Sequence, residues 1–263
     1  SVLLAYSKMT LDKEILDSNL VTDSDFDELL VSYFPKYIQQ TYRAEVLMHY
    51  LRREIIANQL ANLVVNRAGI TFISRFKDEF NVDTSRIVKA WWIAYNLLDA
   101  ATFNQQIEML DNKINANVQV SLLVGVEKAV ERLCRLVLLH IADLDNATGL
   151  INHLKPQITE LVSNIANLID GVNYSEIAEE ESKLLAENVP SHLAQIVSRQ
   201  SYLVQVVDIV TIANKHNLDA NMVARNYFYV GRNLQVDWLR KNVFLLPREN
   251  KWQALARSAL VSD

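Results

Sequence analysis

The chain has 263 residues, of which 50% are hydrophobic and 22% charged, and this balance is typical of a globular protein and not of a disordered one. Lys and Arg total 26 against 31 for Asp and Glu, a formal net charge of -5, and the charges are spread along the chain, which argues against nucleic acid and anionic membrane as partners. With 5 Gly and 4 Pro, against about 18 and 13 at average usage, glycine-rich phosphate loops and strand-turn architectures are not expected.

The first part of the chain is predicted to be a series of short helices. Apolar residues at near-helical spacing predict a helix over 2–18, which could break at Thr10 if that residue caps a second helix. Ser24 and Asp27 stand where a capping-box-like pair would open the next helix. That helix must end before Pro35, because proline disfavours helical backbone at the residue that precedes it.

A longer amphipathic helix is predicted over 43–66, where apolar residues recur at spacings of four or five. Gly69 is expected to end this helix. A short helix should follow over 70–80, and Asp83 is the predicted cap of the helix that runs through Leu98.

The second part of the chain is predicted to be built around its longest helix, 114–142, which comes after a short helix ending at Asp111. Asp143 and Asp145 can cap a short helix that ends near His153.

Pro156 fits the first turn of a further helix, which Gly171 should close. Asp219 is the predicted cap of a later helix. The remaining helices are expected at 175–187, 190–215, 219–231, 233–244 and 250–260.

These patterns predict an all-α fold, a multi-helix bundle with one long central helix in each half. The domain is expected to span 1–263, with two intimate subdomains, 1–112 and 113–263, as an option at this size. No apolar stretch approaches the roughly 20 residues that span a bilayer, so no membrane insertion is expected. The apolar start has no basic leader before it, so we interpret it as a cut through a longer chain.

The sequence contains no strong motif for catalysis, a cofactor or a metal. Its glycines stand far apart, and neither HExxH nor Glu-x-x-His occurs. Two isolated pairs remain, Glu45 with His49 and His140 with Asp143, and these are expected to be surface helix pairs. The single Cys134 lies among apolar residues at helical spacing and is expected to be a core thiol.

The most unusual pattern is a polar stripe on the predicted helix 43–66, with four polar residues at successive i+4 positions. Asparagine is a poor helix former, so three on one stripe need a physical reason. The stripe is either a solvated face or a set of amides at a helix–helix or inter-domain contact. Three flanking arginines could pair with acids on a partner surface. The candidate contact residues are Arg52, Arg53, Glu54, Asn58, Asn62, Asn66 and Arg67.

Several runs resemble one known family. The run 2–9, VLLAYSKM, resembles a stretch that follows the catalytic region of the large bacterial NAD-specific glutamate dehydrogenases. The runs 51–62, LRREIIANQLAN, and 65–72, VNRAGITF, resemble the most characteristic signature of the C-terminal region of that family. The runs 107–113 and 252–257 resemble the family in the same order. The resemblance spans essentially the whole chain, although the stretch from 120 to 235 carries none of these motifs.

The resemblance implies a parent enzyme that oxidatively deaminates L-glutamate to 2-oxoglutarate and ammonia with NAD in the cytoplasm. It places the catalytic residues and the NAD site upstream, so no catalytic, cofactor or metal residue is assigned to this segment. The implied role is a non-catalytic helical C-terminal domain that serves docking, oligomer assembly or regulation. Its expected partners are the upstream dehydrogenase region and further copies of the chain in a homo-oligomer. The main alternative is a free-standing helical protein-interaction module, and a small helical enzyme with an unfamiliar site is a third class.

Overall fold

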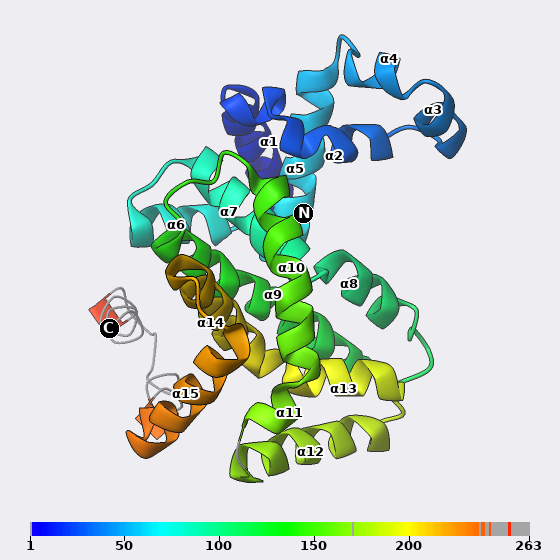
Figure 1. Ribbon diagram of the computed structural model, residues 1–263. Helices are drawn as coiled ribbons and strands as arrows, with labels where there is room; N and C mark the ends of the chain where they lie inside the picture. The colour runs from blue at the N-terminus through cyan, green and yellow to red at the C-terminus, as the bar shows by residue number, and fades with distance from the viewer. Residues whose placement is uncertain (1, 170, 237, 240–241, 243–251, 254–263) are drawn as a thin grey trace. The chain divides into compact units, whose positions relative to one another are not determined.

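The computed structural model describes residues 2–169, 171–236, 238–239, 242 and 252–253. All elements in these residues are helical and none is a strand (Figure 1), which confirms the predicted all-α class. Within the described part, no helix is long and apolar enough to cross a membrane.

The chain forms two compact units that divide within one helix. The first unit is Ser1–Lys155 with Glu187–Val189, and the second is Pro156–Ala186 with Pro190–Asp263. The expected division after residue 112 differs from this boundary. The physical reason is that α9 (Ala116–His140) packs against α7 (Thr84–Leu97) and α8 (Ala100–Glu108), so the longest helix belongs to the first unit.

The first unit is built on α1, which packs along α5, and on α7, which packs along α9. Its core contains fully buried aromatic side chains, among them Trp91, Phe26, Phe72 and Phe76. Besides α7, α8 and α9, its helices are α1 (Val2–Leu16), η1 (Asn19–Thr22), η2 (Ser24–Phe26), α2 (Asp27–Ser32), α3 (Lys36–Thr41), α4 (Arg43–Leu47), α5 (Arg52–Ala68) and α6 (Phe72–Phe80).

Two helix starts in this unit differ from the prediction. Helix α1 runs through Thr10 without a break. Ser24 does not open the second helix, because the Asp23 carboxylate accepts the Asp25 N–H at 2.9 Å and caps the short helix η2 instead. The α-helix that follows begins at Asp27.

The predicted helix 43–66 is two helices with a turn between them. In that turn the imidazole Nδ1 of His49 accepts the Leu51 N–H at 3.2 Å, which gives the chain a local alternative to continuous helix. Gly69 ends α5 as predicted, with φ at +90° and its N–H donated to the Val65 carbonyl. The predicted cap of α7 is confirmed, since the Asp83 carboxylate accepts the Arg86 N–H at 2.8 Å.

Helix α10 (Ala147–Ser163) runs through Pro156, so this proline does not start a new helix as predicted. A proline inside a helix removes one backbone hydrogen bond and strains the preceding turn. Leu154 and Ile158, on either side of it, are both buried, and this apolar packing offsets the lost bond. Gly171 also differs from the prediction, because it begins a helix and does not close one.

The second unit continues from α10 with shorter helices. Helix α12 packs on α13, and α14 packs on α15. The predicted helix 190–215 is three elements, while the predicted Asp219 cap is confirmed by its contact with the Met222 N–H at 3.1 Å. The predicted helices 233–244 and 250–260 lie largely outside the described residues. The elements are α11 (Ile165–Leu168), α12 (Gly171–Ala186), α13 (Ser191–Arg199), η3 (Gln200–Tyr202), α14 (Leu203–His216) and α15 (Ala220–Asn233).

Candidate functional site

The predicted polar stripe lies on the surface of α5. Glu54, Asn58 and Asn66 are exposed and Asn62 is half-buried. The Asn62 side-chain amide donates to the Asn58 backbone carbonyl at 2.9 Å and to its side-chain oxygen at 3.0 Å. These two side chains therefore form hydrogen bonds within their own helix, and the exposed residues of the stripe face solvent.

The three flanking arginines bind acceptors of their own chain. Arg52 donates to the Asp27 carboxylate at 2.7 Å and to the Asp23 carbonyl at 3.2 Å. Arg53 donates to the carbonyl that ends α1, at 2.9 Å. Arg67 pairs with Glu108 of α8 at 3.1 Å. They hold α5 against its neighbours in the first unit, a use that the sequence pattern does not reveal.

A groove between α1 and α5, which we call the α1–α5 groove, adjoins the stripe and encloses about 310 Å³. Its polar lining is Asp12, Glu54, Asn58 and Gln59. Its apolar lining is Leu16, Tyr33, Leu51 and Ile55. The stripe residues Glu54 and Asn58 thus form one wall of a hollow with an apolar component.

The two carboxylates of the α1–α5 groove, Asp12 and Glu54, have no ion pair or hydrogen bond to another described residue. Burial against the groove raises the pKa of Asp12 above its ordinary value. The groove therefore offers negative charge that the first unit itself does not neutralise.

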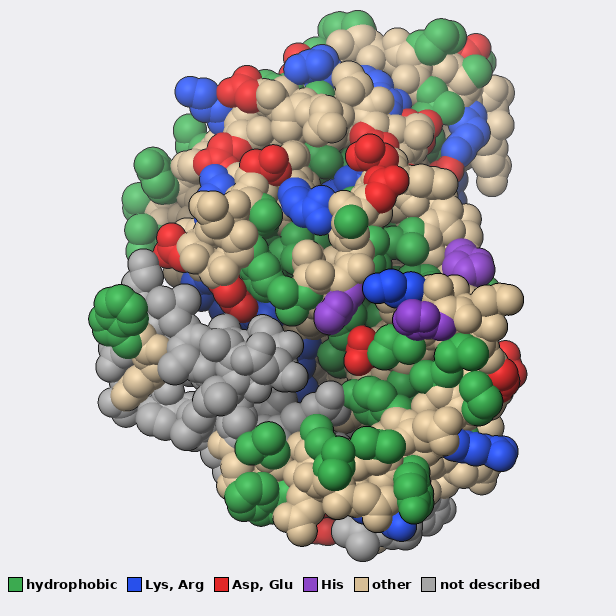
Figure 2. All heavy atoms as spheres, turned by 60° about the vertical axis from the view of Figure 1, so that its left-hand side comes forward, with side chains coloured by type: hydrophobic (Ala, Val, Ile, Leu, Met, Phe, Trp, Pro, Cys, Tyr) green, Lys and Arg blue, Asp and Glu red, His purple; other side chains and the backbone are tan. Residues whose placement is uncertain are grey.

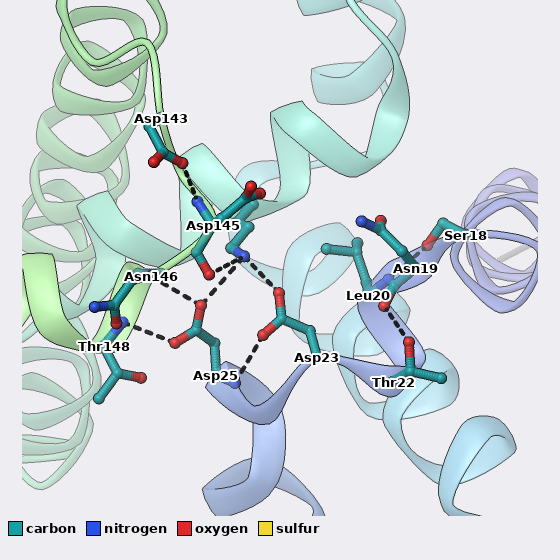
Figure 3. Close-up of polar contacts among 12 residues, drawn as sticks. Ser18, Asn19, Leu20, Thr22, Asp23, Asp25, Asp143, Asp145, Asn146 and Thr148 are labelled. Carbon is teal, nitrogen blue, oxygen red and sulfur yellow. Dashed lines mark hydrogen bonds and ion pairs between the residues drawn. The ribbon is translucent and has the colours of Figure 1, made fainter.

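A second polar centre is an ionic network that joins η2, α7 and the start of α10 (Figure 3). The Lys89 ammonium is buried. It pairs with Asp23, lies 3.2 Å from the Asp25 carboxylate and donates to the Asp145 carbonyl at 3.1 Å. Figure 3 shows Asp23 and Asp25 directed toward the same point, with Thr148 approaching from α10.

The capping role predicted for Asp143 and Asp145 is filled at α10 by Asn146, whose side-chain oxygen accepts the Gly149 N–H at 2.9 Å, and by Asp25 of η2. Its carboxylate accepts the Ala147 N–H at 2.9 Å and the Thr148 N–H at 2.8 Å. Asp143 instead accepts the Asp145 N–H at 2.8 Å within its own loop. Burial alone would raise the pKa of Asp25, but the two amides and Lys89 hold it below its ordinary value.

A third polar centre links α6 and α9. Arg135 contacts Glu79 at 2.9 Å and Glu131 at 2.9 Å, and Arg75 pairs with Glu131 at 2.8 Å. Burial acts to raise the pKa of Glu131, yet the two arginines lower it to about 2. The neighbouring Cys134 is fully buried, and its burial raises the pKa of the thiol well above the usual range, so the thiol is neutral.

A buried acid–amide pair joins α8 to α9. The Asn104 side-chain amide, which is completely buried, donates to Glu127 Oε1 at 3.1 Å. The other oxygen of each group, Asn104 Oδ1 and Glu127 Oε2, is buried and has no partner in the described residues. Burial raises the pKa of Glu127, and the smaller opposing effects of Asn104 and Arg67 do not cancel it. Periodicity could not have identified this pair, since it depends on the packing of α8 on α9.

The described residues contain no group of three or more His, Cys, Asp or Glu side chains placed to hold a metal ion. On the face in Figure 2, basic and acidic side chains are interspersed and do not form a patch of one sign.

Comparison with known proteins gives a match over the full chain. The family model described as glutamate dehydrogenase, C-terminal, matches residues 1–263. Similar curated proteins are the NAD-specific glutamate dehydrogenases of Pseudomonas aeruginosa, 30% identical over 264 residues, Halomonas elongata, 28% over 263, and Mycobacterium tuberculosis, 26% over 263. Each alignment covers 100% of this chain but 16% of the relative.

Proposed function

The chain belongs to the glutamate dehydrogenase C-terminal family, and from this membership we propose that it is the non-catalytic helical region of a larger NAD-specific glutamate dehydrogenase. The parent enzyme oxidatively deaminates L-glutamate to 2-oxoglutarate and ammonia in the cytoplasm and passes a hydride to NAD. The observation that carries the proposal is the family match over residues 1–263, together with relatives that bear this enzyme name and are about six times longer than the match.

Within this proposal the hydride chemistry and the NAD site belong to the preceding dehydrogenase region. The way in which the first unit uses Asp25 and Glu131 supports a structural role. Asp25 accepts two backbone amides, and Glu131 is held by two arginines. Acids engaged in this way stabilise helix contacts and are poorly suited to accept a proton from a substrate.

The region acts by docking against the dehydrogenase region and by supporting a homo-oligomer. We place the docking surface on the exposed side of the α5 stripe and on the adjoining α1–α5 groove. Three of the four stripe residues, Glu54, Asn58 and Asn66, are exposed, and two of them line the groove. Interfaces of this kind combine an apolar centre with a polar rim.

The test compares the full-length parent with a parent that lacks the 263 residues. Glutamate-dependent NAD reduction and oligomer mass, by light scattering, are measured for both. We expect the truncated protein to stay folded but to lose its oligomeric state or its activity. Unchanged mass and unchanged activity would refute the supporting role.

A further inference from the structure

We propose that the α1–α5 groove receives an arginine side chain presented by the dehydrogenase region of the same polypeptide. This inference rests on the proposed function, because it names the chemistry by which the docking surface recognises its partner. The three observations that support it are the unpaired carboxylates of the groove, its apolar lining, and the amount of polypeptide that the relatives carry beyond the matched region.

The first observation concerns charge. Asp12 from α1 and Glu54 from α5 line the same groove, and neither is paired with another described residue. Arg52 and Arg53, the nearest basic residues in sequence to Glu54, are bonded to the Asp27 carboxylate and to a backbone carbonyl. The half-buried Asp12 and the exposed Glu54 favour a partner that brings positive charge into the groove.

The second observation is the apolar part of the lining. Tyr33 is 56% exposed and Leu51 is 38% exposed, and both face this hollow together with Leu16 and Ile55. A long basic side chain can lay its methylene stem on such a surface and keep its charged end on the carboxylates. Arginine fits better than lysine, since its planar guanidinium can also stack on a tyrosine ring and bond two oxygens at once.

The third observation is the size of the relatives. The matched region is 16% of the length of each curated relative, so most of such a polypeptide is available as a tethered partner. Tethering raises the effective concentration to roughly the millimolar range. A modest groove with two charges is then sufficient for docking, whereas a free partner would need a larger interface.

The experiment uses the full-length parent with an Asn58→Cys substitution at the groove wall, and measures alkylation of that cysteine by mass spectrometry. Cys134 is fully buried and does not compete. We expect alkylation at least about tenfold slower than for an unhindered thiol, and a return toward the free rate in about 0.5 M salt, which screens charge pairs.

The decisive variant adds Asp12→Asn and Glu54→Gln, which keep the side-chain shapes and remove both charges. Its matched control adds Glu45→Gln and Asp78→Asn, which remove two charges from exposed positions outside the groove lining. We expect the groove variant to raise the alkylation rate about tenfold, the equivalent of two charge pairs of intermediate strength. The control should match the parent with Asn58→Cys alone.

Phenylglyoxal labelling of the same proteins identifies the occupant. One arginine outside the 263 residues should be protected in the parent and should become reactive in the groove variant only. Protection of Asn58→Cys that is insensitive to the groove variant, or a groove variant in which no arginine outside the 263 residues becomes more reactive, would overturn the inference and leave docking intact. Absence of protection, in a parent whose truncation dissolves the oligomer, would reject this groove but keep the proposed function.

Discussion

Glu127→Gln should make the first unit more stable at alkaline pH. In the folded chain Glu127 and Asn104 form one hydrogen bond and leave an acceptor oxygen on each side without a partner. A proton on Glu127 would supply the missing donor. A glutamine places an N–H at that position at every pH, so the two side chains can form an amide pair with both bonds made.

The sign of the pH dependence follows from the raised pKa of Glu127. The stabilising contribution of the protonated acid is fully present below the unfolded pKa of about 4.3 and is lost as the pH rises through the higher folded value. Each unit of pH within that window lowers the free energy of unfolding by about 1.4 kcal/mol. Glutamine has no proton to lose, so this slope should disappear.

The size of the stability change can be worked out from the two buried oxygens that lack partners, Asn104 Oδ1 and Glu127 Oε2. The Glu127→Gln variant gains one net hydrogen bond and avoids a buried charge. It should therefore be about 1 kcal/mol more stable than the unsubstituted 263-residue chain at pH 8, with little difference at pH 4. Glu127→Ala is the control, because it leaves the buried Asn104 amide without its partner and should cost about 1–3 kcal/mol at both values.

The assay is urea unfolding of the 263-residue chain over a pH series, followed by tryptophan fluorescence. Trp91 is buried on α7 and stacks on Tyr95, in the same unit as the pair. The reasoning would be refuted by a glutamine variant that is less stable than the unsubstituted chain at pH 8. It would also be refuted if the free energy of unfolding of the variant fell with pH between 4 and 8 as steeply as that of the unsubstituted chain.

Three further predictions concern the other polar centres. Asp25→Ala removes the acceptor of two N–H groups at the start of α10 and one partner of the buried Lys89, so it should lower the free energy of unfolding by about 3 kcal/mol, measured by urea denaturation. The arginines lower the pKa of Glu131 to about 2, so its contribution of about 3 kcal/mol to the free energy of unfolding should be present above pH 4.5 and be lost as the pH falls toward 2. Glu131→Gln should remove this acid dependence when unfolding is measured over a pH series. Asn58→Lys with Asn62→Lys should weaken assembly of the parent in light scattering and leave the helical circular dichroism of the chain unchanged; intact assembly would favour a solvated stripe.

Local features of this fold could be predicted where one short segment contains all the relevant groups. Asp83 and Asp219 each cap the helix that follows immediately, and Gly69 supplies a positive φ directly after α5. In these cases the donor, the acceptor and the backbone requirement lie within a few residues, so periodicity and capping rules are sufficient.

The remaining features depend on partners that are distant in sequence. Asp25 accepts two N–H groups at the start of α10, a helix that begins more than a hundred residues later, and local capping rules do not contain such a contact. Pro156 should interrupt a helix by its covalent structure, but buried neighbours outweigh the lost bond. Arg52 appeared free to reach a partner, whereas it bonds to Asp27. Each of these features depends on tertiary packing, which local rules do not describe.

The contrast between engaged and unengaged charges is the strongest argument for locating the docking surface on α5. Lys89 and Arg135 each face two carboxylates, so these two buried cations are satisfied within the first unit. Asp12 and Glu54 are different, since they share a groove with apolar side chains and have no described partner. Asp12 is half-buried and Glu54 is exposed, so a cation from another part of the polypeptide that enters the groove would meet a negative charge from each of the two helices.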